Sequence, residues 1–282
     1  MDKQNELSVA GKVVIVTGAS RGIGRVIALA LAKQGARVVV TARSVSAGDQ
    51  PGTIGETVNK IKANGGVALA IEADMAKEAD LKKLVQRTYE HFGAVDILVN
   101  NAGVTHQKSW SSPLLEIPRS DWEYQYAVNV HAPFTLTQLV APIMEANGGG
   151  RIINITAGCA EVYRLPEEQP FREAIGDFRL AAPAYFSSKR ALDRFSNVVA
   201  AELSRMNIAI IGVMPGLTAS ELTVKNVQTA GLDDSSLVPM EVPARMVAYF
   251  ASCENPLEYT GRLFWAEREL KVLGLEPEYN EL

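Results

Sequence analysis

The chain has 282 residues, 47% of them hydrophobic, and a formal net charge of -4 at pH 7. This length suits one large domain or two ordinary ones, because domains typically hold about 100–200 residues. The slightly acidic balance and the lack of any run rich in Lys and Arg argue against nucleic acid as a partner.

The cysteine content and the lack of long apolar runs argue against a disulfide-rich, secreted or membrane-spanning protein. The two cysteines, Cys159 and Cys253, cannot build a disulfide framework, and free cysteines are usually buried and inert. The first twelve residues, MDKQNELSVAGK, lack the apolar core of a secretory signal. We find no uninterrupted apolar stretch of about 18 residues and expect no membrane span. The sequence therefore predicts a cytoplasmic protein.

Short runs rich in β-branched residues alternate with longer amphipathic segments along the chain. After a polar tail, strands are predicted at residues 12–16, 36–41, 67–71, 97–100, 151–156 and 208–214. Helical periodicity lies between them, near residues 23–34, 53–64, 78–92, 120–146 and 185–205. Strands that alternate with helices predict parallel βαβ units with right-handed crossovers. We therefore expect an α/β fold, a doubly wound parallel sheet in a three-layer α/β/α sandwich, as a single domain over residues 1–282.

Two segments interrupt this alternation. Residues 158–184 separate a predicted strand from the next helix and contain three prolines, and residues 217–243 follow Pro215-Gly216. Loops of this length inside a compact domain are often functional. We expect an insertion at 158–184 and a substrate loop at 217–243; the alternative is two irregular surface loops.

A glycine-rich turn, TGASRGIG at residues 17–24, joins the first strand to the first helix. Glycine has no Cβ and tolerates positive φ, so the backbone can turn sharply and approach a ligand. The helix that follows points free N–H groups and its positive dipole end at the same place. A turn in this context favours a site for a dinucleotide pyrophosphate. The candidate binding residues of the turn are Gly18, Ser20, Arg21, Gly22, Ile23 and Gly24.

Further motifs occur on the expected elements, in an order shared with a known family. They are Asn100-Asn101-Ala102-Gly103 after the fourth strand, Asn129 in the next helix, Tyr185 and Lys189 as Tyr-x-x-x-Lys, and Pro215-Gly216 after the sixth strand. With the Gly-x-x-x-Gly-x-Gly spacing of the turn, they make the chain resemble the short-chain dehydrogenase/reductase family over roughly residues 10–265. The resemblance implies a Rossmann-type fold, hydride transfer between a nicotinamide cofactor and a small-molecule carbonyl or alcohol, and a homodimer or homotetramer.

The end of the second strand indicates which dinucleotide is bound. Enzymes that use NAD usually carry an acidic residue here for the ribose hydroxyls, whereas this strand ends in Thr41-Ala42-Arg43. Arginine binds phosphate through charge-assisted, often bidentate hydrogen bonds. Arg43, together with Arg21 and Ser44, therefore favours NADPH/NADP+. The alternative is that both arginines are merely solvated.

The resemblance also implies the remaining cofactor contacts. It places Asp74 at the adenine, Asn101, Ala102 and Gly103 along the ribose, and Tyr185 and Lys189 near the nicotinamide ribose, with Met75 as a further candidate contact. Pro215, Gly216 and Thr218 follow a strand end, where their backbone and hydroxyl groups are candidates to hold the carboxamide. No residue pattern suggests a metal ion.

Tyr185 and Lys189 form a candidate acid–base pair. A tyrosine with its ordinary pKa of about 10 is a poor acid–base group at neutral pH, and a nearby ammonium lowers that pKa. A spacing of four residues puts both side chains on one helix face. The resemblance implies that Tyr185 is the general acid in reduction, that Lys189 binds ribose hydroxyls, and that Asn129 holds a water in a proton relay. The alternatives are an exposed Tyr/Lys pair and a helix amide bonded locally.

One expected group is missing. The family's catalytic serine, at the end of the fifth strand, falls on Ala157, which cannot donate a hydrogen bond. Loss of such a donor typically lowers turnover about 100- to 1,000-fold. Thr156 is one candidate replacement, although strand alternation argues against it. Cys159 or Tyr163 from the insertion is another. In the third account the chain is a non-catalytic NADP(H)-binding sensor or scaffold.

Overall fold

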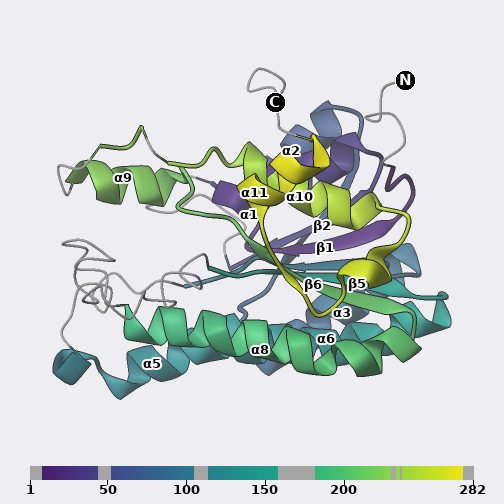
Figure 1. Ribbon diagram of the computed structural model, residues 1–282. Coiled ribbons are helices and arrows are strands. Elements are labelled where there is room, and N and C mark those ends of the chain that lie inside the picture. The colour runs from purple at the N-terminus through teal and green to yellow at the C-terminus, as the bar shows by residue number, and fades with distance from the viewer. Residues whose placement is uncertain are drawn as a thin grey trace.

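A seven-stranded parallel sheet forms the centre of the molecule (Figure 1). The computed structural model describes residues 8–43, 52–104, 114–157, 182–229, 233–235 and 237–275. Within these residues the sheet has the order β3-β2-β1-β4-β5-β6-β7. Its strands are β1 (Val13–Thr17), β2 (Arg37–Ala42), β3 (Val67–Glu72), β4 (Ile97–Asn100), β5 (Gly150–Ile155), β6 (Ile208–Met214) and β7 (Leu263–Trp265).

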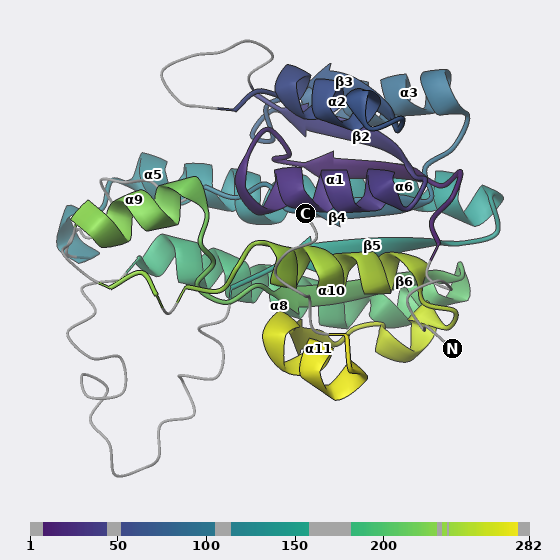
Figure 2. The ribbon, with the colours of Figure 1, turned by 90° about the horizontal axis from the view of Figure 1, so that it is seen from above.

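Helices cover both faces of the sheet, as Figures 1 and 2 show. One face carries α1 (Gly22–Lys33), α2 (Ile54–Ala63), α10 (Glu241–Ser252) and α11 (Ala266–Leu273). The other carries α3 (Glu78–Phe92), α5 (Arg119–Tyr126), the π-helical turn η3 (Ala127–His131), α6 (Ala132–Ala146) and α8 (Pro183–Arg205). The short 3-10 turns η2 (Leu114–Glu116) and η5 (Pro256–Tyr259) and the helix α9 (Glu221–Thr229) complete the described elements. The expected three-layer, doubly wound α/β fold is confirmed.

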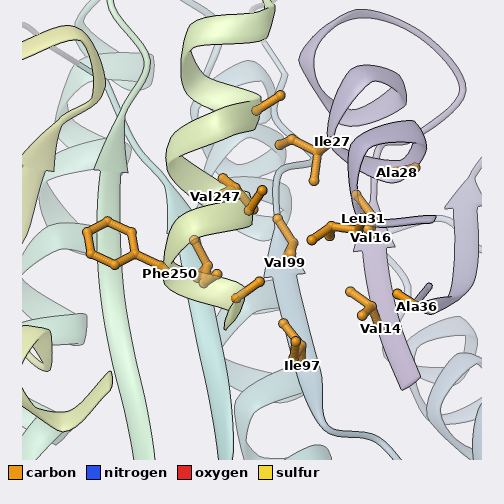
Figure 3. Packing of buried hydrophobic residues seen from close by; sticks show 14 of the residues in the cluster. Val14, Val16, Ile27, Ala28, Leu31, Ala36, Ile97, Val99, Val247 and Phe250 are labelled. Atoms are coloured by element: carbon orange, nitrogen blue, oxygen red, sulfur yellow. The ribbon is translucent and has the colours of Figure 1, made fainter. Parts of the chain in front are cut away.

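Each face of the sheet has its own apolar core. Val14 and Val16 of β1 pack toward α1 and α10, whereas Ile15 between them belongs to the core on the other face. Strands buried on both faces need apolar residues at every position, which explains why β1 reads VVIVT rather than alternating. Figure 3 shows the first core, where Ile27 of α1 and Val247 of α10 meet above the strands.

The strand order reverses between β1 and β4. The chain moves outward from β1 to β2 and β3, then returns to place β4 on the other side of β1. Open parallel sheets bind ligands at such a switch point, outside the carboxyl ends of the strands. In Figures 1 and 2, α5, α9 and the first turns of α8 extend beyond the sheet at the same end of the molecule.

Two elements differ from the sequence-based expectations. The helix predicted over residues 120–146 is divided by η3, which breaks the regular helical hydrogen bonding. The predicted substrate loop 217–243 contains helix α9, because Ser220 caps it by accepting from the Thr223 N–H at 3.3 Å. Of the insertion predicted at 158–184, the part before residue 182 lies outside the described residues. The single-domain assignment stays a prediction.

Candidate active site

The glycine turn is pressed against the loop that follows β4. Gly18 and Gly22 have φ values of 66° and 57°, in the left-handed region that favours glycine. A Cβ on Gly24 would lie 2.3 Å from the Asn101 side-chain nitrogen, and one on Gly18 would lie 2.8 Å from the Ala102 Cα. Side chains at these positions would therefore separate the two loops.

Thr17 and Asn101 tie these two loops together. The Thr17 hydroxyl donates to the Val99 carbonyl at 3.2 Å and accepts from the N–H groups of Asn101 and Ala102, both at 3.0 Å. The Asn101 side-chain amide donates back to the carbonyls of Thr17 at 2.9 Å and Gly18 at 3.3 Å. The Asn101 side chain therefore ties the glycine turn to the loop that follows β4.

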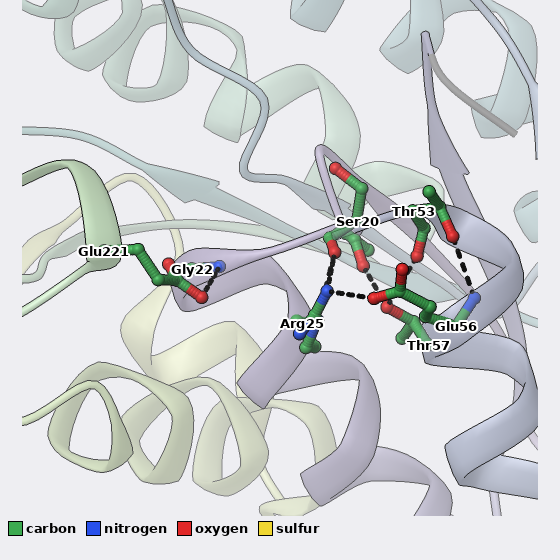
Figure 4. A network of polar contacts seen from close by, with 8 residues as sticks. Ser20, Gly22, Arg25, Thr53, Glu56, Thr57 and Glu221 are labelled. Atoms are coloured by element: carbon green, nitrogen blue, oxygen red, sulfur yellow. Dashed lines mark hydrogen bonds and ion pairs between the residues drawn. The ribbon is translucent and has the colours of Figure 1, made fainter. Parts of the chain in front are cut away.

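Helices α1 and α2 hold the turn from its other side (Figure 4). Arg25 of α1 donates to the Ser20 carbonyl at 3.0 Å through Nε and forms an ion pair with Glu56 of α2 at 3.4 Å. The Thr57 hydroxyl donates to the Ala19 carbonyl at 2.9 Å. The turn is thus fixed by polar contacts on two sides, and Ile23 packs on the core beneath it.

A carboxylate lies at the first backbone N–H of α1. Gly22 N donates to Glu221 Oε1 of α9 at 3.5 Å, the contact drawn at the left of Figure 4. Unpaired N–H groups and the helix dipole stabilise an anion at such a terminus. The position expected for the cofactor pyrophosphate is therefore one that attracts negative charge in this structure, which fits the predicted ligand.

Arg43 lies at the end of β2 and is exposed. Its guanidinium donates to the Tyr124 hydroxyl of α5 at 2.7 Å. Arg43 and Asp74 line a cavity of about 300 Å³. Asp74 accepts from the Ala76 N–H at 3.0 Å, whereas Met75 is buried in the core. Ser44 lies outside the described residues. The remaining residues of this cavity are Glu72, Lys77, Asp80 and Lys83.

Lys189 and Tyr185 lie one turn apart on α8, on the face toward the sheet. Lys189 is 4% exposed, and its Nζ donates to the Ile155 carbonyl at 2.7 Å. The same Nζ lies 5.9 Å from the centre of the Tyr185 ring. Burial lowers the pKa of Lys189 to about 8, against the opposing effect of the Asp193 carboxylate. The predicted helical pair therefore exists, with its ammonium removed from water.

Asn129 lies in η3 and is completely buried. Its Oδ1 accepts from the Val104 N–H at 3.1 Å, and its Nδ2 donates to the Ser188 hydroxyl at 2.9 Å. A Cβ on Gly103 would lie 3.6 Å from both Asn129 Oδ1 and Lys189 Nζ. The structure thus brings Asn129, Lys189 and Gly103 together, as the motif order predicts. π-Helical turns often mark functional sites, but the sequence gives no signal for this one.

The structure buries the Thr156 hydroxyl away from solvent. Thr156 is 1% exposed, and its Oγ1 has no hydrogen-bond partner among the described residues. A side chain in this position is not open to a substrate, which weakens the first of the three accounts for the missing serine. Ala157 is half-buried, and the candidates Cys159 and Tyr163 lie outside the described residues.

The Thr218 side chain closes the turn that follows β6. Gly216 has φ 78°, and the Thr218 hydroxyl donates to the carbonyls of Pro215 at 3.3 Å and Gly216 at 3.2 Å. Thr218 also forms a β-bridge to Val238. These contacts give the predicted carboxamide-binding turn a fixed shape beside β6.

The described part of the chain contains no group of three or more His, Cys, Asp or Glu side chains placed to hold a metal ion. None of its helices is both long enough and apolar enough to cross a membrane.

Comparison with known proteins agrees with this geometry. The family model for short chain dehydrogenases matches residues 12–167 and 176–231. The chain is 34% identical to a 7alpha-hydroxysteroid dehydrogenase of Escherichia coli, over 84% of this chain and 82% of that protein. It is also 34% identical to a 3-oxoacyl-[acyl-carrier-protein] reductase of Synechocystis, over 77% of this chain and 78% of that one.

Solved structures with a similar fold include proteins of the same kind. A hydroxysteroid dehydrogenase from Escherichia coli superposes with a TM-score of 0.76 at 29% identity, over 94% of this chain and 98% of that one. A 7 alpha-hydroxysteroid dehydrogenase complexed with NADH and 7-oxo glycochenodeoxycholic acid also has a TM-score of 0.76, at 30% identity and with 94% and 96% covered. The chain belongs to the short-chain dehydrogenase/reductase family, oxidoreductases that act on CH–OH and C=O groups.

Proposed function

We propose that the protein is an NADPH-dependent oxidoreductase that reduces a carbonyl, or oxidises the matching alcohol, with Tyr185 and Lys189 as its acid–base pair. The observation that carries the proposal is the buried Lys189 ammonium beside Tyr185, at the edge of the sheet where the glycine turn also lies. A buried charge is costly, so a fold that retains one beside a phenol favours a functional explanation.

The residues present fit a nicotinamide dinucleotide. The left-handed Gly18 and Gly22 let the backbone turn sharply before α1, and the α1 terminus attracts the carboxylate of Glu221. Gly103 keeps open the space next to Asn129 and Lys189, where a nicotinamide ribose would lie. When bound, the cofactor supplies or accepts the hydride.

The protein's own groups handle the proton. Tyr185 holds a proton on its hydroxyl and donates it to the carbonyl oxygen in reduction, or takes it from the alcohol in oxidation. The Lys189 Nζ lies 5.9 Å from the centre of the Tyr185 ring, and a positive charge beside a phenol favours its phenolate form. Asn129 holds the Val104 backbone and Ser188 of α8 in place, and we propose that it also orients a water toward Lys189.

Arg43 supports NADPH over NADH. Ala42 stands where an NAD enzyme would have a carboxylate, and the exposed Arg43 follows it, with its guanidinium donating to the Tyr124 hydroxyl at 2.7 Å. A 2′-phosphate would gain a charge-assisted contact there, which the ribose hydroxyl of NADH cannot match. Arg21 and Ser44 complete the proposed phosphate site.

The activity test measures NADPH oxidation with a panel of carbonyl compounds. Because its relatives include a hydroxysteroid dehydrogenase and a 3-oxoacyl reductase, the panel contains a 7-oxo steroid and a 3-oxoacyl thioester besides aldehydes and quinones. Tyr185→Phe should abolish turnover, whereas Tyr89→Phe, at a side chain 51% exposed, should retain it. Full turnover in Tyr185→Phe would disprove the assignment.

Ala157 bears on a second candidate function. Its methyl group cannot donate to the substrate oxygen, an observation that favours a protein that binds NADP(H) without turnover. If the missing donor limits a real enzyme, Ala157→Ser raises the rate at least about tenfold, since one such donor is typically worth 100- to 1,000-fold. Tight NADPH binding with no turnover by either protein on any carbonyl would favour the non-catalytic alternative.

The wider assignments stay predictions. They are the single domain over residues 1–282 with its insertion and substrate loop, a cytoplasmic location, and assembly as a homodimer or homotetramer. Size-exclusion chromatography with light scattering tests the assembly directly.

A further inference from the structure

A second buried ionisable group lies one helical turn after Lys189. The Asp193 side chain on α8 is 11% exposed, and its Oδ2 accepts from Arg190 Nη1 at 3.1 Å. Its other oxygen, Oδ1, is buried and has no hydrogen-bond partner among the described residues. Carboxylates are rarely buried unless both oxygens are satisfied, so this half-paired group requires an explanation.

The Thr156 hydroxyl lies on the same side of α8. It follows Ile155, whose carbonyl accepts from Lys189 Nζ, so the end of β5 faces both Lys189 and Asp193. Thr156 Oγ1 and Asp193 Oδ1 are both buried, and neither has a hydrogen-bond partner among the described residues. Thr156 is therefore better placed to act on Asp193 than on a substrate.

The groups that face this pair come from the elements around α8. Strand β6, which packs on α8, has no charged residue, and the end of β5 presents the neutral Ile155 carbonyl, with the Thr156 hydroxyl just after it. The charged residue of β5, Arg151, donates to the Phe250 and Cys253 carbonyls instead. Arg190 on α8 is the external partner of Asp193. Burial lowers the pKa of Lys189, and the charge of Asp193 opposes that shift. The titratable residues of the other elements packed against α8 are His131 on η3, Glu145 on α6, and Arg119, Asp121, Glu123, Tyr124 and Tyr126 on α5.

We propose that Asp193 is a positioning residue of the acid–base centre, whose buried carboxylate is the counter-charge that keeps Lys189 an ammonium. The inference rests on the proposed role of Lys189 and adds a residue that the motif Tyr-x-x-x-Lys does not contain. Asp193 touches neither cofactor nor substrate. It acts through Lys189, and Arg190 contacts the carboxylate from the solvent side.

The two pKa values define the range in which the pair is fully charged. Burial raises the pKa of Asp193 to about 6, against the hydrogen bond and charge of Arg190 and the charge of Lys189. Burial lowers the pKa of Lys189 to about 8. Between these values the carboxylate and the ammonium coexist. Below about 6 the counter-charge is lost, and above about 8 the ammonium is lost.

A direct test measures the pKa of Lys189 rather than the activity. The full-length protein is labelled with ¹⁵N,¹³C-lysine, and the Lys189 signal is assigned from its loss in Lys189→Arg and followed by NMR against pH. In Asp193→Asn, or in Asp193→Ser if the asparagine variant does not fold, the pKa of Lys189 should fall by about one pH unit, a tenfold change in the ammonium-to-amine ratio. Arg190→Gln removes the other partner of the carboxylate and should not lower it.

Kinetics separate the inference from the proposed function. If both hold, the alkaline limb of kcat/KM for NADPH-dependent reduction moves to lower pH in Asp193→Asn by the same amount as the pKa of Lys189. A pKa shift without any change in the pH profile would support the counter-charge and disprove the catalytic role of Lys189. An unchanged pKa of Lys189 in the Asp193 variants would overturn the inference, whatever the activity.

Discussion

Thr17 and Thr41 provide a matched pair for testing what holds the cofactor site together. They are register partners on the adjacent strands β1 and β2, and they are 1% and 0% exposed. The Thr17 hydroxyl makes three hydrogen bonds, whereas the Thr41 hydroxyl has none among the described residues. Valine has nearly the same shape as threonine, so Thr17→Val and Thr41→Val differ mainly in the polar contacts that are lost.

The expected magnitude follows from the groups left without partners. In Thr17→Val the Asn101 N–H still reaches the Val99 carbonyl at 3.1 Å, but the Ala102 N–H loses the acceptor that the structure shows for it. A net loss of about 1 kcal/mol per hydrogen bond, plus one unsatisfied donor, gives a destabilisation of about 2–4 kcal/mol. Thr41→Val replaces an unpaired buried hydroxyl with a methyl group and should be neutral or stabilising by up to about 2 kcal/mol.

Urea unfolding followed by circular dichroism measures both free energies of unfolding, and a fluorescence titration with NADPH measures binding. Thr17→Val should also weaken NADPH binding, because the wild-type Thr17 hydroxyl fixes the loop that carries Ala102 beside the glycine turn. Thr17→Ser retains the hydroxyl and should preserve most of that affinity. Equal destabilisation by Thr17→Val and Thr41→Val would refute the reasoning, since burial and shape would then matter and hydrogen bonding would not.

Three further predictions concern charge and space at the site. The fold lowers the pKa of Lys189 to about 8 from 10.5, so the unfolded chain binds more protons between these values and wild-type stability rises with pH there. Lys189→Met should be about 2 kcal/mol more stable than wild type at pH 7 by urea unfolding, with the difference shrinking toward pH 10; a constant difference would contradict this. Glu221→Gln removes the carboxylate at the α1 terminus and should lower the NADPH dissociation constant about two- to fivefold, whereas Glu241→Gln should not. Gly24→Ala would place a Cβ 2.3 Å from the Asn101 amide and should weaken NADPH binding at least about tenfold by calorimetry; unchanged affinity would show that the loops can separate.

The layers of the fold could be predicted because the pattern of apolar residues that marks each strand or helix lies within a short stretch of sequence. Strands such as β1 are buried on both faces and read as short β-branched runs, and the helices between them keep their apolar periodicity. The strand-turn-helix context also identified the glycine turn. Parallel strands end at one edge of the sheet, so residues that follow different strands could be grouped into one site before their contacts were known.

What could not be predicted depends on contacts between distant segments. The bond from Arg43 to Tyr124 joins residues 81 positions apart, and the bond from Gly22 to Glu221 joins residues 199 apart. No periodicity connects such positions. The π-helical turn around Asn129 was missed for a related reason, since its residues have ordinary helical character and only packing against α8 distinguishes them.

Thr156 shows that the side to which a strand residue points determines what its side chain can contact, even where the residue type alone would allow another role. A hydroxyl stands next to the position where the family has its serine, and composition alone makes it an adequate substitute. Adjacent side chains of an extended segment point to opposite sides, and the Thr156 N–H bonds the Val213 carbonyl as part of the sheet. Its hydroxyl is consequently enclosed with Asp193 on the α8 side. A shift of one residue thus turns a threonine hydroxyl away from the side of the strand where a substrate would lie and into the protein interior.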